Sequence, residues 1–228
     1  MTISVADVLR GTKVVLLDFD GPIAALFGGV SATAAIEELT AIAAAHGYDI
    51  TAEGPPQFVQ KVSQLGDEEL LHAITDAARD AEVRAAASAV PTPGARAVMR
   101  AARETGRRVA IVSNNAPAAV SAYLDRHDLG QDVDLVVGRH DGLAPRLMKP
   151  HPYLLTLALT SLGVPAEAGA FIGDSVSDIE AGRAAGVAAI GYANKPGKRE
   201  RLSAAGAHAV IETMTDLADA LHAAVGSA

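Results

Sequence analysis

Short runs of β-branched and aliphatic residues alternate along the chain with longer Ala-rich segments of helical period. This alternation is typical of an α/β protein with a parallel sheet. The runs predict strands at residues 14–18, 109–113, 133–137, 170–173, 188–191 and 209–211. Each run is followed by a turn signal and most are followed by a helical pattern. We therefore expect a doubly wound parallel sheet covered by helices.

The long interval between the first two strands predicts only helices. Residues 31–46 have a helical pattern that ends before Gly47, and residues 67–88 form a second pattern with an acidic first turn. The stretch PTPG at 91–94 separates them from another helix at 95–104. We expect a Rossmann-like core made of residues 1–22 and 91–228, with a helical unit of residues 23–90 inserted after the first strand.

The composition of the chain argues against several kinds of binding partner and excludes several kinds of metal site. The net charge is -8 and no cysteine is present, which argues against nucleic acid or anionic membrane as a partner and excludes disulfides and thiolate metal sites. The histidines are not paired at metal-ligand spacing. The first residues, MTISVADVLRGTK, lack a charged segment followed by an apolar one, so we expect a cytoplasmic protein. Oligomeric state is not predicted.

Polar side chains gather where the predicted strands end. In a doubly wound sheet these carboxyl ends meet at one edge, where ligands bind. Clustered carboxylates form an all-oxygen site suited to Mg²⁺, whereas a hydroxyl, a helix N-terminus and an ammonium suit a phosphate group. The candidates are Asp18 and Asp20 after the first strand, Ser113 and Asn114 after the second, Lys149 after the third, and Asp174 and Asp178 after the fourth.

The segments DFDG, VSNN, KPHP and IGDSVSDIEAGRAAG, in this order, resemble the motifs of the haloacid dehalogenase superfamily. The resemblance is to its phosphatase branch with a helical (C1-type) cap, including phosphoglycolate phosphatases, and it covers the whole core. It implies a Mg²⁺-dependent phosphoric monoester hydrolase that acts on a small phosphorylated metabolite through an aspartyl-phosphate intermediate. The inserted unit at 23–90 would be the cap.

The resemblance also implies a role for each candidate. Asp18 would be the nucleophile, and Asp20 the general acid that protonates the leaving oxygen and then activates water. The metal would be held by the Asp18 and Asp174 carboxylates and the backbone carbonyl of Asp20, with Asp178 supporting it directly or through water. The phosphoryl oxygens would be held by Ser113, Asn114 and Lys149.

One residue departs from the family pattern, and two other functions stay open. Pro22 stands where the family has Thr or Val, and proline fixes φ and removes an N–H donor. We interpret it as a stiffened turn. A phosphomutase of the β-phosphoglucomutase type would use the same core, and a catalytically silent module would bind phosphate without turnover. A dehalogenase is disfavoured because that branch lacks the second aspartate, which Asp20 supplies here.

Several candidates also have purely structural interpretations. The stretch Ser177-Asp178-Ile179-Glu180 fits a capping box at a helix start, and Ser113 could cap the helix that begins at Pro117. Lys149 alone would be a typical exposed lysine. We favour the functional interpretation because the members of the set fall at the correct strand ends in the correct order.

The remaining polar features are interpreted as solvent-exposed. The basic run NKPGKRER at 194–201 predicts an exposed helix start, and Arg139, His140 and Arg146 are each expected to be exposed. The cap decides which substrate enters, but no spacing rule selects among its candidate residues Tyr48, Gln57, Phe58 and Lys61.

Overall fold

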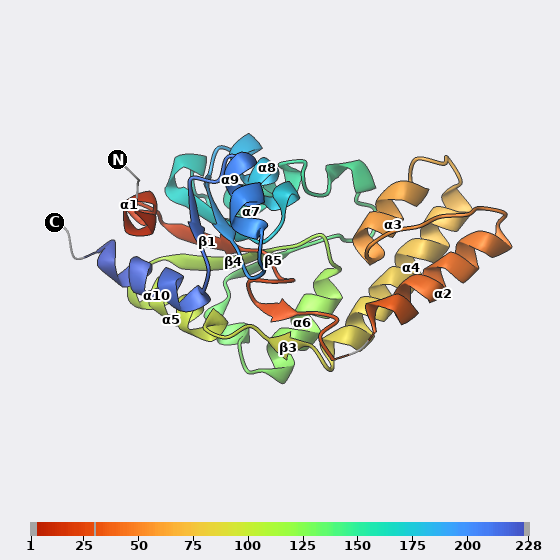
Figure 1. The fold of residues 1–228 in the computed structure, drawn as a ribbon, viewed down its shortest axis with the longest axis horizontal. Coiled ribbons are helices and arrows are strands. Elements are labelled where there is room, and N and C mark those ends of the chain that lie inside the picture. Colours follow the sequence, from red (N-terminus) through yellow and green to blue (C-terminus); the bar gives the residue numbers. More distant parts are fainter. Residues whose placement is uncertain (1–3, 30, 226–228) are drawn as a thin grey trace.

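The computed structural model describes residues 4–29 and 31–225; the predicted core's ends at 1–3 and 226–228, and position 30 of the predicted cap, lie outside the described residues. A six-stranded sheet in the order β5-β4-β1-β6-β7-β8 forms the centre of the molecule, and every pairing in it is parallel (Figure 1). This confirms the predicted α/β class. Its strands are β1 (Val14–Leu17), β4 (Arg108–Val112), β5 (Leu135–Val137), β6 (Gly169–Gly173), β7 (Ala188–Tyr192) and β8 (Ala209–Ile211).

Helices cover both faces of the sheet, so alternate positions of each strand enter different cores. Val15 and Leu17 of β1 belong to one cluster, whereas Val14 and Leu16 belong to the other, and all four are fully buried. Burial on both faces explains why these strands read as continuous apolar runs. One face is covered by α1 (Val5–Leu9), α5 (Ala95–Glu104), α6 (Pro117–Arg126) and α10 (Met214–Ala223). The other is covered by α7 (Tyr153–Leu162), α8 (Val176–Ala184) and α9 (Lys198–Ala204).

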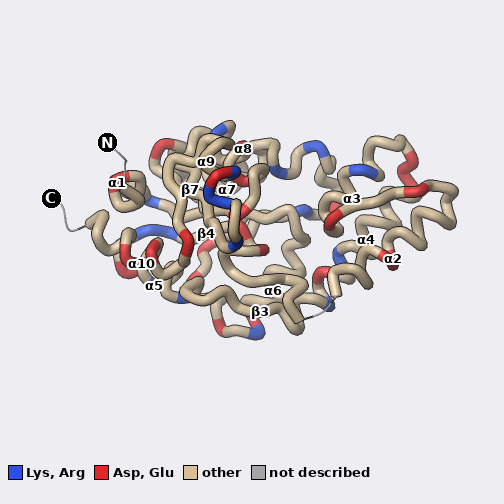
Figure 2. The backbone as a smooth tube through the Cα atoms, viewed as in Figure 1, with Lys and Arg blue, Asp and Glu red and all other residues tan. Residues whose placement is uncertain are grey.

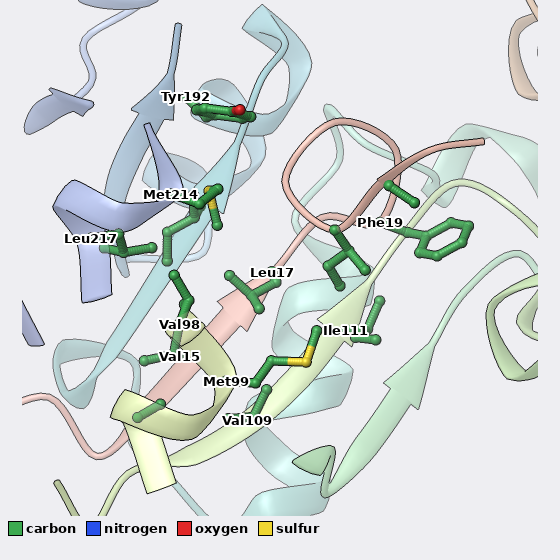
Figure 3. Packing of buried hydrophobic residues seen from close by; sticks show 14 of the residues in the cluster. Val15, Leu17, Phe19, Val98, Met99, Val109, Ile111, Tyr192, Met214 and Leu217 are labelled. Carbon is green, nitrogen blue, oxygen red and sulfur yellow. The ribbon is translucent and has the colours of Figure 1, made fainter. Parts of the chain in front are cut away.

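The core beside β1 also anchors the loop that follows the strand. Figure 3 shows Leu17 packed among side chains of α5 and α10, with Phe19 farther along the same segment. Phe19 is fully buried, and its ring meets the Tyr123 ring edge-on at a centroid distance of 5.3 Å. Because Phe19 faces the core, the backbone on either side of it is fixed at the edge of the sheet.

Three helices form the end of the molecule that lies away from both termini (Figure 1): α2 (Ala32–Ala45), α3 (Pro55–Val62) and α4 (Glu68–Ala86). They pack together through Leu39, Phe58 and Leu70, all fully buried. The two long helices confirm the sequence prediction. The short helix α3 was not predicted, because it begins with Pro55-Pro56, which signals a turn as readily as a helix. The boundaries at 23 and 90 stay a prediction.

The expectation that this interval holds no strand was wrong. β2 (Ala24–Ala25) and β3 (Val90–Pro91) pair antiparallel at the two points where the chain enters and leaves the helical unit. Two residues are too few to produce the alternation by which strands are recognised in a sequence. This small ribbon holds the two connecting segments side by side.

A buried ion pair joins the helical unit to the sheet. The two terminal nitrogens of the Arg139 guanidinium, Nη1 and Nη2, donate to the Glu82 carboxylate of α4 at 3.0 Å, and the two side chains are at most 2% exposed. Arg139 also donates to the Asn114 carbonyl at 2.9 Å, and Glu82 accepts the Ala116 N–H at 2.8 Å. The expectation that Arg139 is exposed was wrong. Arg139 is buried because Glu82, 57 residues away in sequence, forms an ion pair with it.

Charged residues of both signs are interspersed along the described backbone in Figure 2, on helices and loops alike. Within residues 4–29 and 31–225, none of the helices combines the length and the apolar character needed to cross a membrane.

We predict that Glu82→Gln lowers the free energy of unfolding by about 3–5 kcal/mol, because it leaves the Arg139 charge buried without its counter-ion. Replacing both partners by methionine should cost much less, since no unpaired charge remains. Urea unfolding of the two variants checks this. A Glu82→Gln variant within about 0.5 kcal/mol of the wild type would contradict it.

Candidate active site

The carboxyl ends of three neighbouring strands meet at one edge of the sheet. Leu17 of β1 pairs with Ile111 of β4 on one side and with Ile172 of β6 on the other. The chain runs outward from β1 to β4 and β5, and then returns to β6, so this edge is a topological switch point where ligands bind. A cavity of about 710 Å³ opens there. All of the predicted site residues line it: Asp18, Asp20, Ser113, Asn114, Lys149, Asp174 and Asp178.

Lys149 lies between two carboxylates at the floor of this cavity. Its Nζ is 2.8 Å from Asp18 Oδ1 and 2.6 Å from Asp178 Oδ1, and it also donates to the Val112 carbonyl at 3.2 Å. The side chain is only 3% exposed. Burial lowers the pKa of Lys149, but Asp178 and Asp18 raise it by more, so the ammonium keeps its charge. The interpretation of Lys149 as an exposed surface lysine is wrong.

Asp18 is the buried member of the aspartate pair. Its Oδ1 accepts the Phe19 N–H at 2.8 Å as well as the Lys149 contact. Burial and the neighbouring charge of Asp178 raise the pKa of Asp18 to about 8, although Lys149 opposes the shift. Lys149 therefore offsets the charge of Asp18 after β1 and of Asp178 at the start of α8.

Asp20 faces the cavity from the turn that follows β1. Its Oδ1 accepts the Leu26 N–H at 3.0 Å, which fixes the carboxyl group. The side chain is open to the cavity, yet desolvation by the surrounding protein raises the pKa of Asp20 above its usual value. The turn closes through the Gly21 N–H to the Ala24 carbonyl at 2.8 Å, on either side of Pro22, so the proline fits the turn.

Three carboxylates are arranged as a hard-ligand set. Oxygens of Asp18, Asp174 and Asp178 lie within 4.8 Å of one another, and such a set fits Mg²⁺. The backbone of Gly21 passes so close to Asp174 that a Cβ there would lie 2.5 Å from Asp174 Cγ. Only glycine permits this approach, and the residue also has a φ of +113°.

Asp174 receives hydrogen bonds from a segment that the sequence analysis placed in solvent. Lys198 Nζ contacts its Oδ2, and Asn194 Nδ2 donates to the same oxygen at 3.2 Å. The Lys198 side chain is 15% exposed. The interpretation of the basic run at 194–201 as a solvated helix start was therefore wrong at Lys198, because the loop after β7 turns back over the site.

Asp178 is held by the start of α8. It accepts the Ser175 N–H at 3.0 Å and the Ser175 hydroxyl at 2.6 Å, so that Ser175 and Asp178 form the capping box. The predicted box of Ser177 with Glu180 was wrong by two positions, because the helix begins at Val176. Asp178 thus caps the helix and contacts Lys149 with its other oxygen.

Ser113 and Asn114 are engaged within the protein. The buried Ser113 hydroxyl donates to Asn115 Oδ1 at 3.0 Å. Asn114 spans the backbone of Lys149: its Oδ1 accepts the Lys149 N–H at 2.8 Å, and its Nδ2 donates to the Lys149 carbonyl at 3.0 Å. Asn114 therefore positions Lys149, and its predicted contact with phosphate stays a prediction.

The candidate cap residues differ in where they lie. Gln57 lines the cavity, whereas Phe58 is fully buried in the helical unit and Lys61 donates to the Thr51 carbonyl. Tyr48 packs partly buried against the same core. Glu53 and Gln60 also line the cavity, and neither was predicted from the sequence. A signal for both was present in the Gly-Pro-Pro stretch between them, which predicts a chain reversal.

A family model for haloacid dehalogenase-like hydrolases matches residues 12–186, which is more than half of the chain. The chain belongs to this family. Family membership confirms the resemblance inferred from the motifs DFDG, VSNN, KPHP and IGDSVSDIEAGRAAG.

Curated relatives named phosphoglycolate phosphatase are similar to part of this family member. The one from Pseudomonas savastanoi pv. phaseolicola is 34% identical over 98 residues, covering 43% of this chain and 35% of the relative. The one from Rhodospirillum rubrum is 34% identical over 131 residues, covering 56% and 51%. The matched segments thus span about a third to a half of the length of these relatives.

Solved structures share the fold over almost the whole chain. CbbY from Rhodobacter sphaeroides in complex with phosphate has a TM-score of 0.66 at 20% identity, covering 90% of this chain and 96% of that one. A hydrolase from Pseudomonas syringae has a TM-score of 0.69 at 18% identity, covering 91% and 97%. These likenesses support the family's fold.

We predict that Gly21→Ala is more damaging than Gly11→Ala, although both residues have positive φ. At Gly11 no atom lies within 4 Å of the added Cβ. The free energy of unfolding of Gly11→Ala should therefore fall by only about 1–2 kcal/mol, the cost of a left-handed conformation. Gly21→Ala adds the collision with Asp174 and should lose at least about twice as much. Urea unfolding of both variants checks this, and equal losses would contradict it.

We predict that Asp18→Asn stabilises the metal-free chain, and increasingly so as the pH rises. The folded-state pKa of about 8 lies above the about 3.9 of an unfolded aspartate, so the folded chain keeps a proton that the unfolded chain releases. The resulting stability is complete below about pH 4 and is lost as the pH rises through about 8. The advantage of the variant should therefore grow by up to about 4 kcal/mol between about pH 5 and pH 8.

Urea unfolding of the wild type and the Asp18→Asn variant in the presence of a metal chelator measures this difference. A difference in unfolding free energy that stays constant over the same pH range would contradict the raised pKa of Asp18.

Proposed function

We propose that this chain is a Mg²⁺-dependent phosphatase that hydrolyses a small phosphorylated metabolite through an aspartyl-phosphate intermediate. The observation that carries the proposal is the placement of Asp18, whose carboxylate is fixed by Lys149 at 2.8 Å on the floor of a cavity that Asp20 also lines. Membership of the hydrolase family and the likeness to phosphoglycolate phosphatases support it.

Asp18 is the nucleophile. Its Oδ1 takes the hydrogen bonds from Lys149 and from the Phe19 N–H, whereas Oδ2 accepts none from the described residues. Oδ2 attacks phosphorus, the bond from phosphorus to the leaving oxygen breaks, and an acyl phosphate forms on Asp18. Lys149 stays protonated and offsets negative charge on the carboxylate and the phosphoryl oxygens.

Asp20 moves the protons. Its pKa is raised by desolvation, which favours the protonated form that a general acid needs. It gives its proton to the leaving oxygen. In the second half of the reaction Asp20 accepts a proton from water, whose oxygen attacks phosphorus and releases phosphate together with the Asp18 carboxylate. The hydrogen bond from the Leu26 N–H at 3.0 Å holds the carboxyl group in place for both steps.

The donor set suits Mg²⁺. The Asp18 and Asp174 carboxylates and the backbone carbonyl of Asp20 would hold the ion, and Asp178 would support it directly or through water. When bound, the ion would supply positive charge that offsets the charge of the phosphoryl group. Ser113 would reach a phosphoryl oxygen by turning its hydroxyl away from Asn115, and Asn114 would keep Lys149 in place.

We predict that phosphate release from small phosphate monoesters depends on Mg²⁺ and on both aspartates. Asp18→Asn should lower kcat by about 10⁴-fold or more, because the neutral amide that replaces the carboxylate is a much weaker nucleophile. Asp20→Asn should lower kcat by about 10²–10⁴-fold, the usual worth of a general acid. Phosphate release from a panel of monoesters, with Mg²⁺ or with a chelator, measures both. Asp125→Asn, an exposed substitution on α6, is the matched control and should keep full activity.

Two outcomes would overturn the proposal in different ways. Conversion of a sugar 1-phosphate to its 6-phosphate without phosphate release would identify a phosphomutase. Binding of monoesters with no turnover in the folded, metal-loaded protein would identify a phosphate-binding module. Turnover that survives in Asp18→Asn would remove the role given to that residue.

A further inference from the structure

One wall of the active-site cavity comes from the helical unit and carries no basic side chain among the described residues. This wall, here called the cap wall, comprises the loop residue Glu53 and the first turns of α3, including Gln57 and Gln60. Pro55 and Pro56 complete its surface. The cap wall lines the same cavity as Asp18 and Lys149, so the organic part of a phosphate ester bound at Asp18 would extend along it.

The cap wall is hydrogen-bonded to the loop that carries Lys149, which is the phosphate end of the site. Gln60 Nε2 donates to the Lys149 carbonyl at 3.4 Å, which brings α3 against the loop that carries Lys149. Gln57 Oε1 accepts the Glu53 N–H at 2.7 Å, which fixes the Gln57 amide. Gln57 Nε2 therefore remains available as a donor, and Gln60 Oε1 and the Glu53 carboxylate remain available as acceptors, since none of them takes part in a hydrogen bond with the described residues. Acceptors next to a donor are suited to hydroxyl groups.

The start of α3 does not form an anion site, although a helix N-terminus points to the cavity. Pro55 and Pro56 occupy the first helical positions, and neither has an N–H to donate. The N-cap residue, Gly54, provides no side chain. The first turn of α3 therefore lacks the backbone N–H donors with which a helix N-terminus usually binds a carboxylate.

The charges of the cavity act against a second anion. Its lining contains the acids Asp18, Asp20, Asp174, Asp178 and Glu53. The described basic residues of the lining are Lys149 and Lys195. Lys149 is paired with its two carboxylates, and the charge of Lys195 acts on the Asp20 carboxylate, which belongs to the core side of the cavity. An anionic leaving group would meet the Glu53 carboxylate without a cation on the same wall.

We propose that the cap wall selects a neutral, hydroxyl-bearing leaving group and discriminates against one that carries a carboxylate. The inference rests on the proposed phosphatase function. It separates this chain from a phosphatase of phosphoglycolate, because the organic part of that compound ends in a carboxylate. The residues that make the selection are Glu53, Gln57 and Gln60.

Three monoesters of similar size test this selection: glycerol phosphate, which is neutral beyond its phosphate, 2-phosphoglycolate, which carries a carboxylate, and phosphoethanolamine, which carries an ammonium. We expect kcat/KM for glycerol phosphate to exceed that for 2-phosphoglycolate by about tenfold or more. A preference for 2-phosphoglycolate of any size overturns the inference. A tenfold or greater preference for phosphoethanolamine over glycerol phosphate also overturns it, in favour of a cation site.

A charge reversal at Glu53 distinguishes an effect of the cap wall from an effect of the net charge of the protein. Glu53→Lys should raise the ratio of kcat/KM for 2-phosphoglycolate to that for glycerol phosphate by about tenfold. Glu37→Lys, an exposed reversal on α2 outside the cavity, is the matched control and should leave the ratio unchanged. Lys195→Gln should change kcat/KM for the three esters by a similar factor. A ratio that responds equally to Glu53→Lys and Glu37→Lys contradicts the role of the cap wall.

Ester binding to the Asp18→Asn variant tests the selection by the cap wall separately from the proposed phosphatase activity. Calorimetric titration of the Mg²⁺-loaded variant gives the dissociation constant of each ester without turnover. If glycerol phosphate binds more tightly than 2-phosphoglycolate but the wild type hydrolyses neither, the phosphatase proposal fails and the selection stands. If the wild type hydrolyses 2-phosphoglycolate best, the selection fails and the phosphatase proposal stands. Equal binding of the two esters to the variant overturns the selection.

Discussion

The buried ammonium of Lys149 is the group on which the arrangement of this site depends. It lies 2.8 Å from Asp18 at the end of β1 and 2.6 Å from Asp178 at the start of α8, and both neighbours are largely removed from solvent. Burial and the charge of Asp178 raise the pKa of Asp18 to about 8 even beside Lys149, and without the ammonium that pKa would rise further. The ion pair therefore fixes three separate chain segments at one edge of the sheet.

A second buried ion pair extends this arrangement to the helical unit. Arg139, paired with Glu82 of α4, donates to the carbonyl of Asn114, and the Asn114 amide holds the backbone of Lys149. The helical unit is thus joined to the phosphate end of the site through a continuous set of hydrogen bonds, and Gln60 of α3 adds a second link to Lys149. A wall that selects the leaving group needs this fixed distance from the reacting carboxylate.

The sequence predicts the parts of this protein that are set by local pattern. The parallel strands follow from apolar runs buried on both faces, and the placement of Asp18, Lys149 and Asp174 follows from the rule that ligands bind at carboxyl ends of strands. The partnership of Glu82 with Arg139 could not be predicted, because pairing over 57 positions leaves no local signal. The contact of Lys198 with Asp174 was missed for the same reason, since it depends on how a loop turns back over the sheet.

The central claim is that the Asp18 carboxylate accepts the phosphoryl group. Acid quenching during turnover, followed by peptide mass spectrometry, tests it most directly. In Asp20→Asn the water that attacks phosphorus lacks its base, so a phosphoryl adduct should accumulate on the peptide that contains Asp18, with an activated ester such as an aryl phosphate as the substrate. The adduct should be absent from Asp18→Asn. Substrate turnover with no adduct on this peptide in either the wild type or the Asp20→Asn variant would contradict the account.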